Sequence, residues 1–228
     1  MILECQRQEV ADRLSALDIE RLYLPNLSNI KPTKQKHIPI LAPPTEILKT
    51  RKRVIVIIND ESQDLGILAY RQLQRDLGLN GGSVINFVKE VFNRSTDSIE
   101  GFDICDDCAA IEDKEMGTPG IIVLNTGQLL YSHDTGTALS NRSWLAKPKK
   151  SICHDVVQVN ETWNRIEGHR TPKEHIKTVF DTILYNADFV ATDAEIYVIA
   201  IQNGAENLLK VLDGQCKLCP MGTTSPTN

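Results

Sequence analysis

Long apolar runs and an excess of positive charge are both missing from this chain of 228 residues. Its longest apolar runs, at residues 54–58, 121–124 and 196–201, are much shorter than the roughly 18 residues that a membrane-spanning helix needs. Charged residues begin at Glu4 and Arg7, too early for the apolar core of a signal peptide. We therefore expect an intracellular protein without membrane attachment.

The shortage of positive charge argues against extensive nucleic-acid binding. Lysine and arginine number 25 against 30 aspartate and glutamate residues, which gives a formal net charge of −5. Wide contact with a phosphate backbone needs a basic surface. The two basic clusters, residues 49–53 and 147–150, are short and typical of solvated segments beside a strand or a loop. We expect no direct, extensive binding to nucleic acid.

Six cysteines occur, and four of them form two C-x-x-C pairs. Without a secretory signal, disulfides are not expected. Cys105 with Cys108, and Cys216 with Cys219, could together supply the four thiolates of a zinc site. The two pairs lie much further apart in sequence than those of a zinc ribbon, so free surface thiols are the favoured interpretation. We expect no metal and no cofactor, with this zinc site as a weak alternative.

Strand and helix patterns alternate along the chain. Buried strands are predicted at residues 53–58, 120–125 and 195–201, where apolar side chains occupy both faces. Apolar residues at helical spacing predict helices at residues 65–77, 84–92, 171–184 and 205–212. This order predicts the α/β class, with a mainly parallel sheet and helices on both of its faces.

Three parts are predicted along the chain. Residues 1–50 form an N-terminal helix, with Val10, Leu14 and Leu17 on one face, and a proline-rich arm. Five prolines between residues 25 and 44 disfavour helix and central strand, so the arm is expected to lie extended on a surface. Residues 51–213 form the α/β domain, which includes a polar surface loop at residues 93–118. Residues 214–228 are expected to be a disordered tail.

The most informative segment is residues 196–212, where a strand, a tight turn and a helix follow one another. This is the context of the nucleophile elbow G-x-S-x-G, whose glycines let strand and helix approach closely. The five positions here are Ala200, Ile201, Gln202, Asn203 and Gly204. The carboxamide of Gln202 stands in place of the serine and is not a nucleophile. The segment is therefore either a degenerate elbow with no catalytic residue or an ordinary strand-to-helix turn.

Polar residues also follow the other predicted strands. Asn59 and Asp60 end the first strand, Asn125 ends the second, and His133 comes shortly after it. Open α/β sheets bind ligands outside the carboxyl ends of their strands, so these four residues could line one binding crevice. Capping of the following helices explains the asparagines and the aspartate equally well.

Three segments carry a family resemblance when they are taken together. They are residues 53–92, with NGGSVINFVK at 80–89, residues 120–133, with the sequence GIIVLNTGQLLYSH, and residues 168–212, with GHRTPKEHIKTVF and IYVIAIQNGAENLLKVL. In family order and over residues 22–213, the chain resembles the Argonaute-binding-protein-two (Arb-type) domain family, most closely its fungal members. That family is similar to α/β-hydrolases, and many members keep the elbow as G-x-S-D-G. This chain departs from it at Ala200, Gln202 and Asn203.

The resemblance implies a scaffold with protein partners in the nucleus or the cytoplasm. Family members are linked to Argonaute complexes, small-RNA-directed heterochromatin and histone methylation, and a similar domain in some fungal class II histone deacetylases is associated with histone binding. The chain ends soon after the elbow helix, where an α/β-hydrolase continues with strands that carry its acid and histidine. We therefore expect a partly truncated α/β-hydrolase-like binding domain without activity. The alternative is an esterase-like hydrolase with a non-standard nucleophile.

Overall fold

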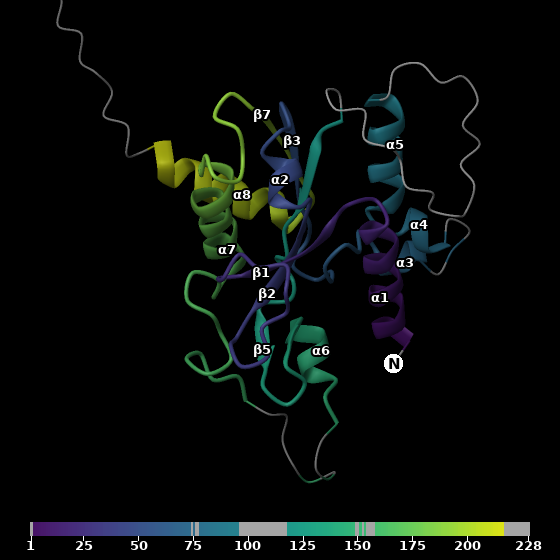
Figure 1. Ribbon diagram of the computed structural model, residues 1–228. Coiled ribbons are helices and arrows are strands. Elements are labelled where there is room, and N and C mark those ends of the chain that lie inside the picture. The colour runs from purple at the N-terminus through teal and green to yellow at the C-terminus, as the bar shows by residue number, and fades with distance from the viewer. Residues whose placement is uncertain are drawn as a thin grey trace, which may run out of the picture.

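The computed structural model describes residues 2–73, 75, 78–95, 118–148, 151, 153 and 158–216. Five strands form the central sheet, in the order β1-β2-β4-β3-β7 (Figure 1). They are β1 (Glu20–Leu24), β2 (Ile38–Ala42), β3 (Arg53–Ile58), β4 (Gly120–Val123) and β7 (Glu195–Ala200). A separate hairpin pairs β5 (Leu130–Ser132) with β6 (Thr137–Leu139). The helices are α1 (Ile2–Ser15), α2 (Thr45–Leu48), α3 (Tyr70–Leu73), α4 (Gly78–Gly81), α5 (Ile85–Ser95), α6 (Asn141–Leu145), α7 (Pro172–Val179) with its π-helical continuation η1 (Phe180–Leu184), and α8 (Asn203–Cys216).

The sheet is mixed, and most of its strands point the same way. β3 pairs in parallel with both β4 and β7, whereas β2 runs antiparallel to β1 and to β4. Only β2 is therefore reversed within this sheet. The α/β class and the three predicted strands are confirmed, and the carboxyl ends of β3, β4 and β7 lie at the same edge.

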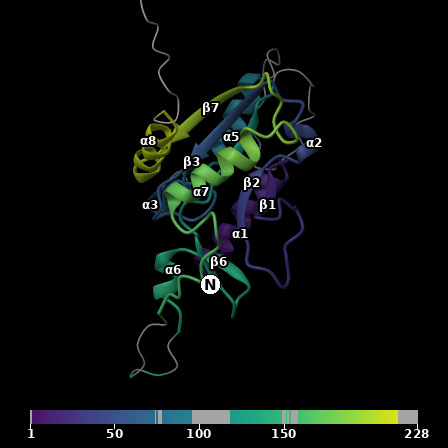
Figure 2. The same cartoon turned by 90° about the vertical axis from the view of Figure 1, so that its left-hand side faces the viewer.

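Helices cover both faces of the sheet, as predicted (Figures 1 and 2). Successive residues of a strand point to opposite faces. On one face Val56 of β3 joins Ile176 of α7 in a buried cluster that also includes residues of η1 and α8. On the other face Ile57 of β3 packs in a second cluster with Val10 of α1 and Val88 of α5. The core thus consists of two apolar layers that share the sheet.

The expectation of a strand-free arm at residues 25–50 is wrong. β2 lies within it and pairs with β1, so residues 20–42 belong to the same sheet as the predicted domain at 51–213. Pro39 is tolerated because it lies opposite Tyr23, whose backbone N–H and C=O bond with Ser28 at 2.8 and 3.4 Å instead. The missing N–H of Pro39 therefore costs this strand pair no hydrogen bond.

The expected helix at residues 65–77 is also wrong. Turns occupy residues 61–66, and only Tyr70–Leu73 is helical in the described part of that range. The backbone N–H of Leu65 donates to Gln128 Oε1 at 3.1 Å, and the carbonyl of Gly66 accepts from Val84 N at 3.0 Å. Gly66 also has a φ of +78°, which a helix does not allow. Tertiary hydrogen bonds have therefore replaced those of a helix.

β7 is an edge strand, although its apolar sequence predicts a buried one. Only β3 pairs with it among the described residues. Tyr197 and Ile199 are 51% and 40% exposed, and Ile196 and Val198 are each 36% exposed. The apolar pattern on both faces belongs to a strand with neighbours on both sides, and this strand has one.

Several expectations fall on other parts of the chain. Most of the predicted loop at residues 93–118, and the tail beyond Cys216, lie outside the described residues. α8 extends to Cys216, three residues past the predicted domain end at 213. No helix in the described ranges is long and apolar enough to cross a membrane.

Candidate functional site

The turn after β7 has the geometry of an elbow. Gln202 adopts a φ of +50°, the left-handed conformation that residues other than glycine rarely adopt, and its side chain is exposed. A Cβ atom on Gly204 would lie 2.7 Å from the carbonyl oxygens of both Ile58 and Asn59. Strand β3 therefore passes so close to the start of α8 that only glycine fits there. The predicted position of each elbow residue is present, with glutamine at the tip.

Asp60 occupies the backbone donor beside the elbow tip. Asn203 N donates to Asp60 Oδ2 at 3.2 Å, and Ser62 N donates to Asp60 Oδ1 at 2.8 Å. Burial raises the pKa of Asp60, but hydrogen bonds from Ser62 and Asn203 outweigh it and hold the pKa below its ordinary value. In an α/β-hydrolase the N–H of the residue after the nucleophile stabilises the oxyanion. Here that N–H serves a carboxylate, whose charge would repel an oxyanion.

The polar residues at the strand ends lie close together and bond mainly with backbone. Thr126 Oγ1 donates to Asn59 O at 2.7 Å, which ties the end of β4 to the end of β3. Asn59 Oδ1 accepts from Asp60 N at 2.8 Å. Asn125 is 1% exposed, donates to Pro39 O at 2.9 Å and accepts from Gln128 N at 2.9 Å. These amides stabilise the loops around the carboxyl edge, as the capping interpretation predicts.

Two buried histidines lie behind this edge. Thr171 caps α7 by accepting from Glu174 N at 3.2 Å, as its sequence predicts, and His175 follows in the first turn. Asn125 N donates to His175 Nε2 at 3.3 Å, and the Nδ1 atoms of His175 and His169 are 2.9 Å apart. Burial lowers the pKa of His169 to about 4. Burial and the neighbouring His169 place the pKa of His175 well below its ordinary value.

Comparison with protein families now assigns the chain. The family model described as the Arb2 domain matches residues 1–219. The chain belongs to the Arb2 domain family. The predicted Arb-type resemblance is thereby confirmed, and the match also takes in the N-terminal helix. No curated protein and no solved structure matched the chain, so its likeness to α/β-hydrolases stays a prediction.

His133 lies apart from the other predicted crevice residues of this Arb2 domain. Its ring stacks on Trp163 with centroids 4.4 Å apart, and its Nε2 is 2.9 Å from Trp163 O. Within the described ranges, no hydrogen bond or ring contact joins His133 to Asn59, Asp60 or Asn125. The sequence placed it near the carboxyl edge because it follows β4, but the β5–β6 hairpin holds it.

The weak zinc alternative cannot be located in the Arb2 domain. Cys105, Cys108 and Cys219, and the side chain of Cys216, lie outside the described residues. Among the residues that are described, no group of three or more His, Cys, Asp or Glu side chains is arranged to hold a metal ion.

The sequence analysis missed two features of this Arb2 domain. It did not link Asp60 to the elbow, because the two are far apart in sequence. It also did not pair His169 with His175, although both flank the clear helix start at Thr171 and Pro172. Two histidines on either side of a cap were the only available signal.

Proposed function

We propose that this Arb2 domain is a non-catalytic, α/β-hydrolase-like binding domain that engages an Argonaute-containing silencing complex in the nucleus or the cytoplasm. The observation that carries the proposal is the elbow itself. Gln202 stands at the exposed tip, and Asp60 occupies the adjacent N–H of Asn203 at 3.2 Å. Both the nucleophile and the oxyanion donor of a hydrolase are thereby replaced.

The topology supports the hydrolase-like part of the proposal. The order β1-β2-β4-β3-β7, with β2 reversed, is the strand order typical of an α/β-hydrolase up to its elbow strand. The turn after β7 lies beside the loop after β3, the loop that supplies the second oxyanion donor in such enzymes. A family that once had hydrolase chemistry explains why the elbow shape persists without its serine.

The outer edge of β7 supports a protein partner. Its register with β3 directs Ile196 and Val198 to the face of α8, and Tyr197 and Ile199 to the opposite face. All four are at least 36% exposed, and Leu209 of α8 is 59% exposed. A strand edge offers a row of backbone donors and acceptors that an extended chain satisfies. The partner contribution that fits is therefore an extended, apolar segment that adds a strand to β7.

This surface gives a direct binding test. We expect Ile199→Lys to weaken binding to the purified Argonaute protein of the same organism at least about tenfold, since it places a charge on the apolar edge. Leu145→Lys is the matched control, because Leu145 is 64% exposed on α6, away from β7. Biolayer interferometry measures both, with core histones as a second analyte.

The proposal fails if the wild-type domain binds no Argonaute protein, or if the two variants bind it equally well. Binding to histones alone would assign the domain to a chromatin partner instead. In each case circular dichroism establishes first that the variants are folded.

A further inference from the structure

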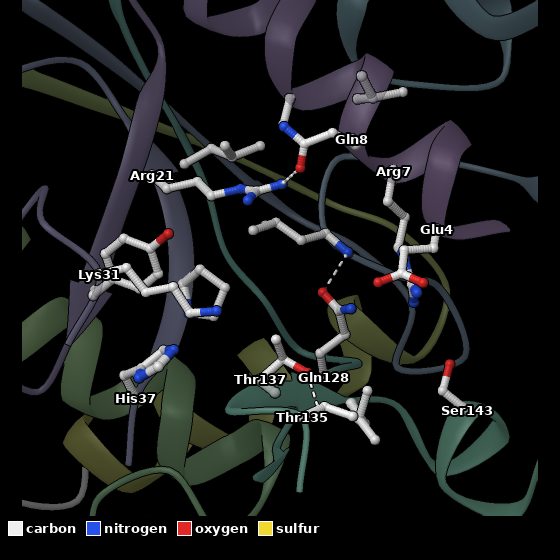
Figure 3. Close-up of a pocket in the computed structure, with 18 of the residues that line it drawn as sticks. Glu4, Arg7, Gln8, Arg21, Lys31, His37, Gln128, Thr135, Thr137 and Ser143 are labelled. Carbon is white, nitrogen blue, oxygen red and sulfur yellow. Dashed lines mark hydrogen bonds between the residues drawn. The ribbon is translucent and has the colours of Figure 1, made fainter. Parts of the chain in front are cut away.

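A second hollow lies on the α1 side of the molecule, and none of the elbow residues lines it. It is a cavity of about 520 Å³ between α1, the β1–β2 pair, the β5–β6 hairpin and α6 (Figure 3). Its size is within the range of about 300–1,000 Å³ that small-molecule sites have. The side chain of Gln128 reaches it from the loop after β4, so it opens near the carboxyl edge of the sheet, where ligands of α/β proteins bind.

Positive charge gathers in this cavity although the whole chain carries a net charge of −5. Arg7, Arg21, Lys31 and Lys147 line it, against the single carboxylate of Glu4. Arg7 is paired with Asp64 at 2.9 Å, and Lys147 lies 3.4 Å from Asp134.

Arg21 and Lys31 are the cations available to a ligand. Arg21 makes a long hydrogen bond of 3.4 Å to Gln8. Neither Arg21 nor Lys31 has a carboxylate within salt-bridge distance among the described residues. Figure 3 shows both on the same side of the cavity as His37. Two cations without a counter-ion at one side of a concave site favour an anion with more than one negative charge.

The same side of the cavity contains a neutral imidazole. Burial lowers the pKa of His37, and the charge of Lys31 adds to this effect against an opposing hydrogen bond. His37 Nδ1 is 3.0 Å from Gln35 O, so this nitrogen carries the proton. Nε2 is then free of a proton and accepts a hydrogen bond from a ligand hydroxyl or amine.

The remaining lining is polar on one side and apolar at the base. Thr135, Thr137, Ser143 and Gln128 supply hydroxyl and amide groups. The apolar lining includes Val10, Leu41, Leu65 and Leu139. A ligand that suits all three regions has an anionic group, several hydroxyls and a flat or apolar body.

We propose that this cavity binds a mononucleotide. Arg21 and Lys31 bind its phosphate, the threonine hydroxyls and Gln128 contact its sugar, and the apolar lining packs against its base. A phosphate monoester carries close to two negative charges at pH 7, which matches the two cations. The site is independent of the elbow and does not rest on the proposed binding role of β7.

Isothermal titration calorimetry of the whole chain with four probes tests the proposal. The probes are AMP, ribose 5-phosphate, adenosine and inorganic phosphate. We expect AMP to bind more tightly than each of the other three, because only AMP has phosphate, sugar and base together. Arg21→Gln and Lys31→Gln are each expected to weaken AMP binding about tenfold or more. Arg94→Gln is the matched control, since Arg94 lies at the end of α5 and is 79% exposed.

Three results would overturn the proposal. The first is an absence of AMP binding by the folded wild-type chain at millimolar ligand. The second is equal binding of AMP and adenosine, or equal AMP binding by the Arg21→Gln and Arg94→Gln variants, because the phosphate would then not be recognised at this site. The third is equal binding of AMP and inorganic phosphate, which would leave a simple anion site without nucleotide recognition.

Discussion

Gly204→Ala is expected to lower the free energy of unfolding by about 2–4 kcal/mol, since overpacking against backbone cannot be relieved by a side-chain movement. A Cβ atom there would meet the carbonyl oxygens of Ile58 and Asn59 at 2.7 Å and Ile58 Cγ2 at 3.1 Å. Either β3 and α8 must separate, or the turn at Gln202 must change. Both consequences alter the elbow, so the variant tests whether its shape depends on this close approach.

Gly214→Ala is the matched control on the same helix. No atom lies within 4 Å of the Cβ position of Gly214, and α8 extends past it to Cys216. We expect its free energy of unfolding to stay unchanged or to rise by up to about 1 kcal/mol, because alanine favours helix over glycine. Urea unfolding followed by circular dichroism measures both variants. Equal stability of the two would contradict the close contact between β3 and α8.

The stability of the domain is expected to fall by about 3 kcal/mol as the pH drops from about 6.5 to 4, from His169 alone. Its pKa is lowered by burial from 6.5 to about 4. Between these two values the unfolded chain binds a proton that the folded chain does not bind. Acid therefore favours unfolding, and above pH 6.5 the effect is absent because the ring is neutral in both states.

The hydrogen bonds explain why both rings stay neutral. Asn125 N donates to His175 Nε2, so the proton of His175 is on Nδ1 and faces Nδ1 of His169 at 2.9 Å. A proton added to either ring would place two N–H groups face to face. The pair also holds Asn125, whose side chain bonds with Pro39 O. Acid is therefore expected to loosen the loop after β4 together with the core.

His169→Asn tests this account, since asparagine retains an acceptor near the position of Nδ1 and removes a titrating group. We expect a shallower dependence of unfolding free energy on pH between 4 and 7 than in the wild-type chain. His133→Asn is the control, because that ring is exposed on the hairpin. Urea unfolding at five pH values measures the slopes. The same slope for His169→Asn and the wild type would contradict the buried pair.

The α/β class was predictable because its signals are local. Residues 53–58 and 120–125 are apolar on both faces, as central parallel strands require, and both strands are present. Thr171 and Pro172 defined the start of α7 correctly, since a cap depends only on its own turn. The elbow at Gln202 was found for the same reason, because strand, turn and helix follow one another directly.

The remaining features depend on contacts between distant segments. The turns at residues 61–66 replaced a helix because Gln128 and Val84 bond with their backbone, and no local pattern announces such bonds. Pro39 lies in a strand because its partner Tyr23 bonds elsewhere. The exposure of β7 depends on which strands surround it, whereas its sequence only says that it is apolar. Asp60 meets Asn203 across 143 positions of sequence.

The claim that this elbow keeps its shape without its chemistry is tested most directly by labelling with a broad fluorophosphonate probe. The purified wild-type chain and its Gln202→Ser variant are treated together, beside an active serine hydrolase. We expect no labelling of the wild type, which has no serine at the tip. We also expect none of Gln202→Ser, because the carboxylate of Asp60 occupies the N–H of Asn203. Labelling of the variant alone would contradict this blocking role of Asp60. Labelling of the wild type would contradict the central claim, and mass spectrometry of the modified residue would identify the nucleophile.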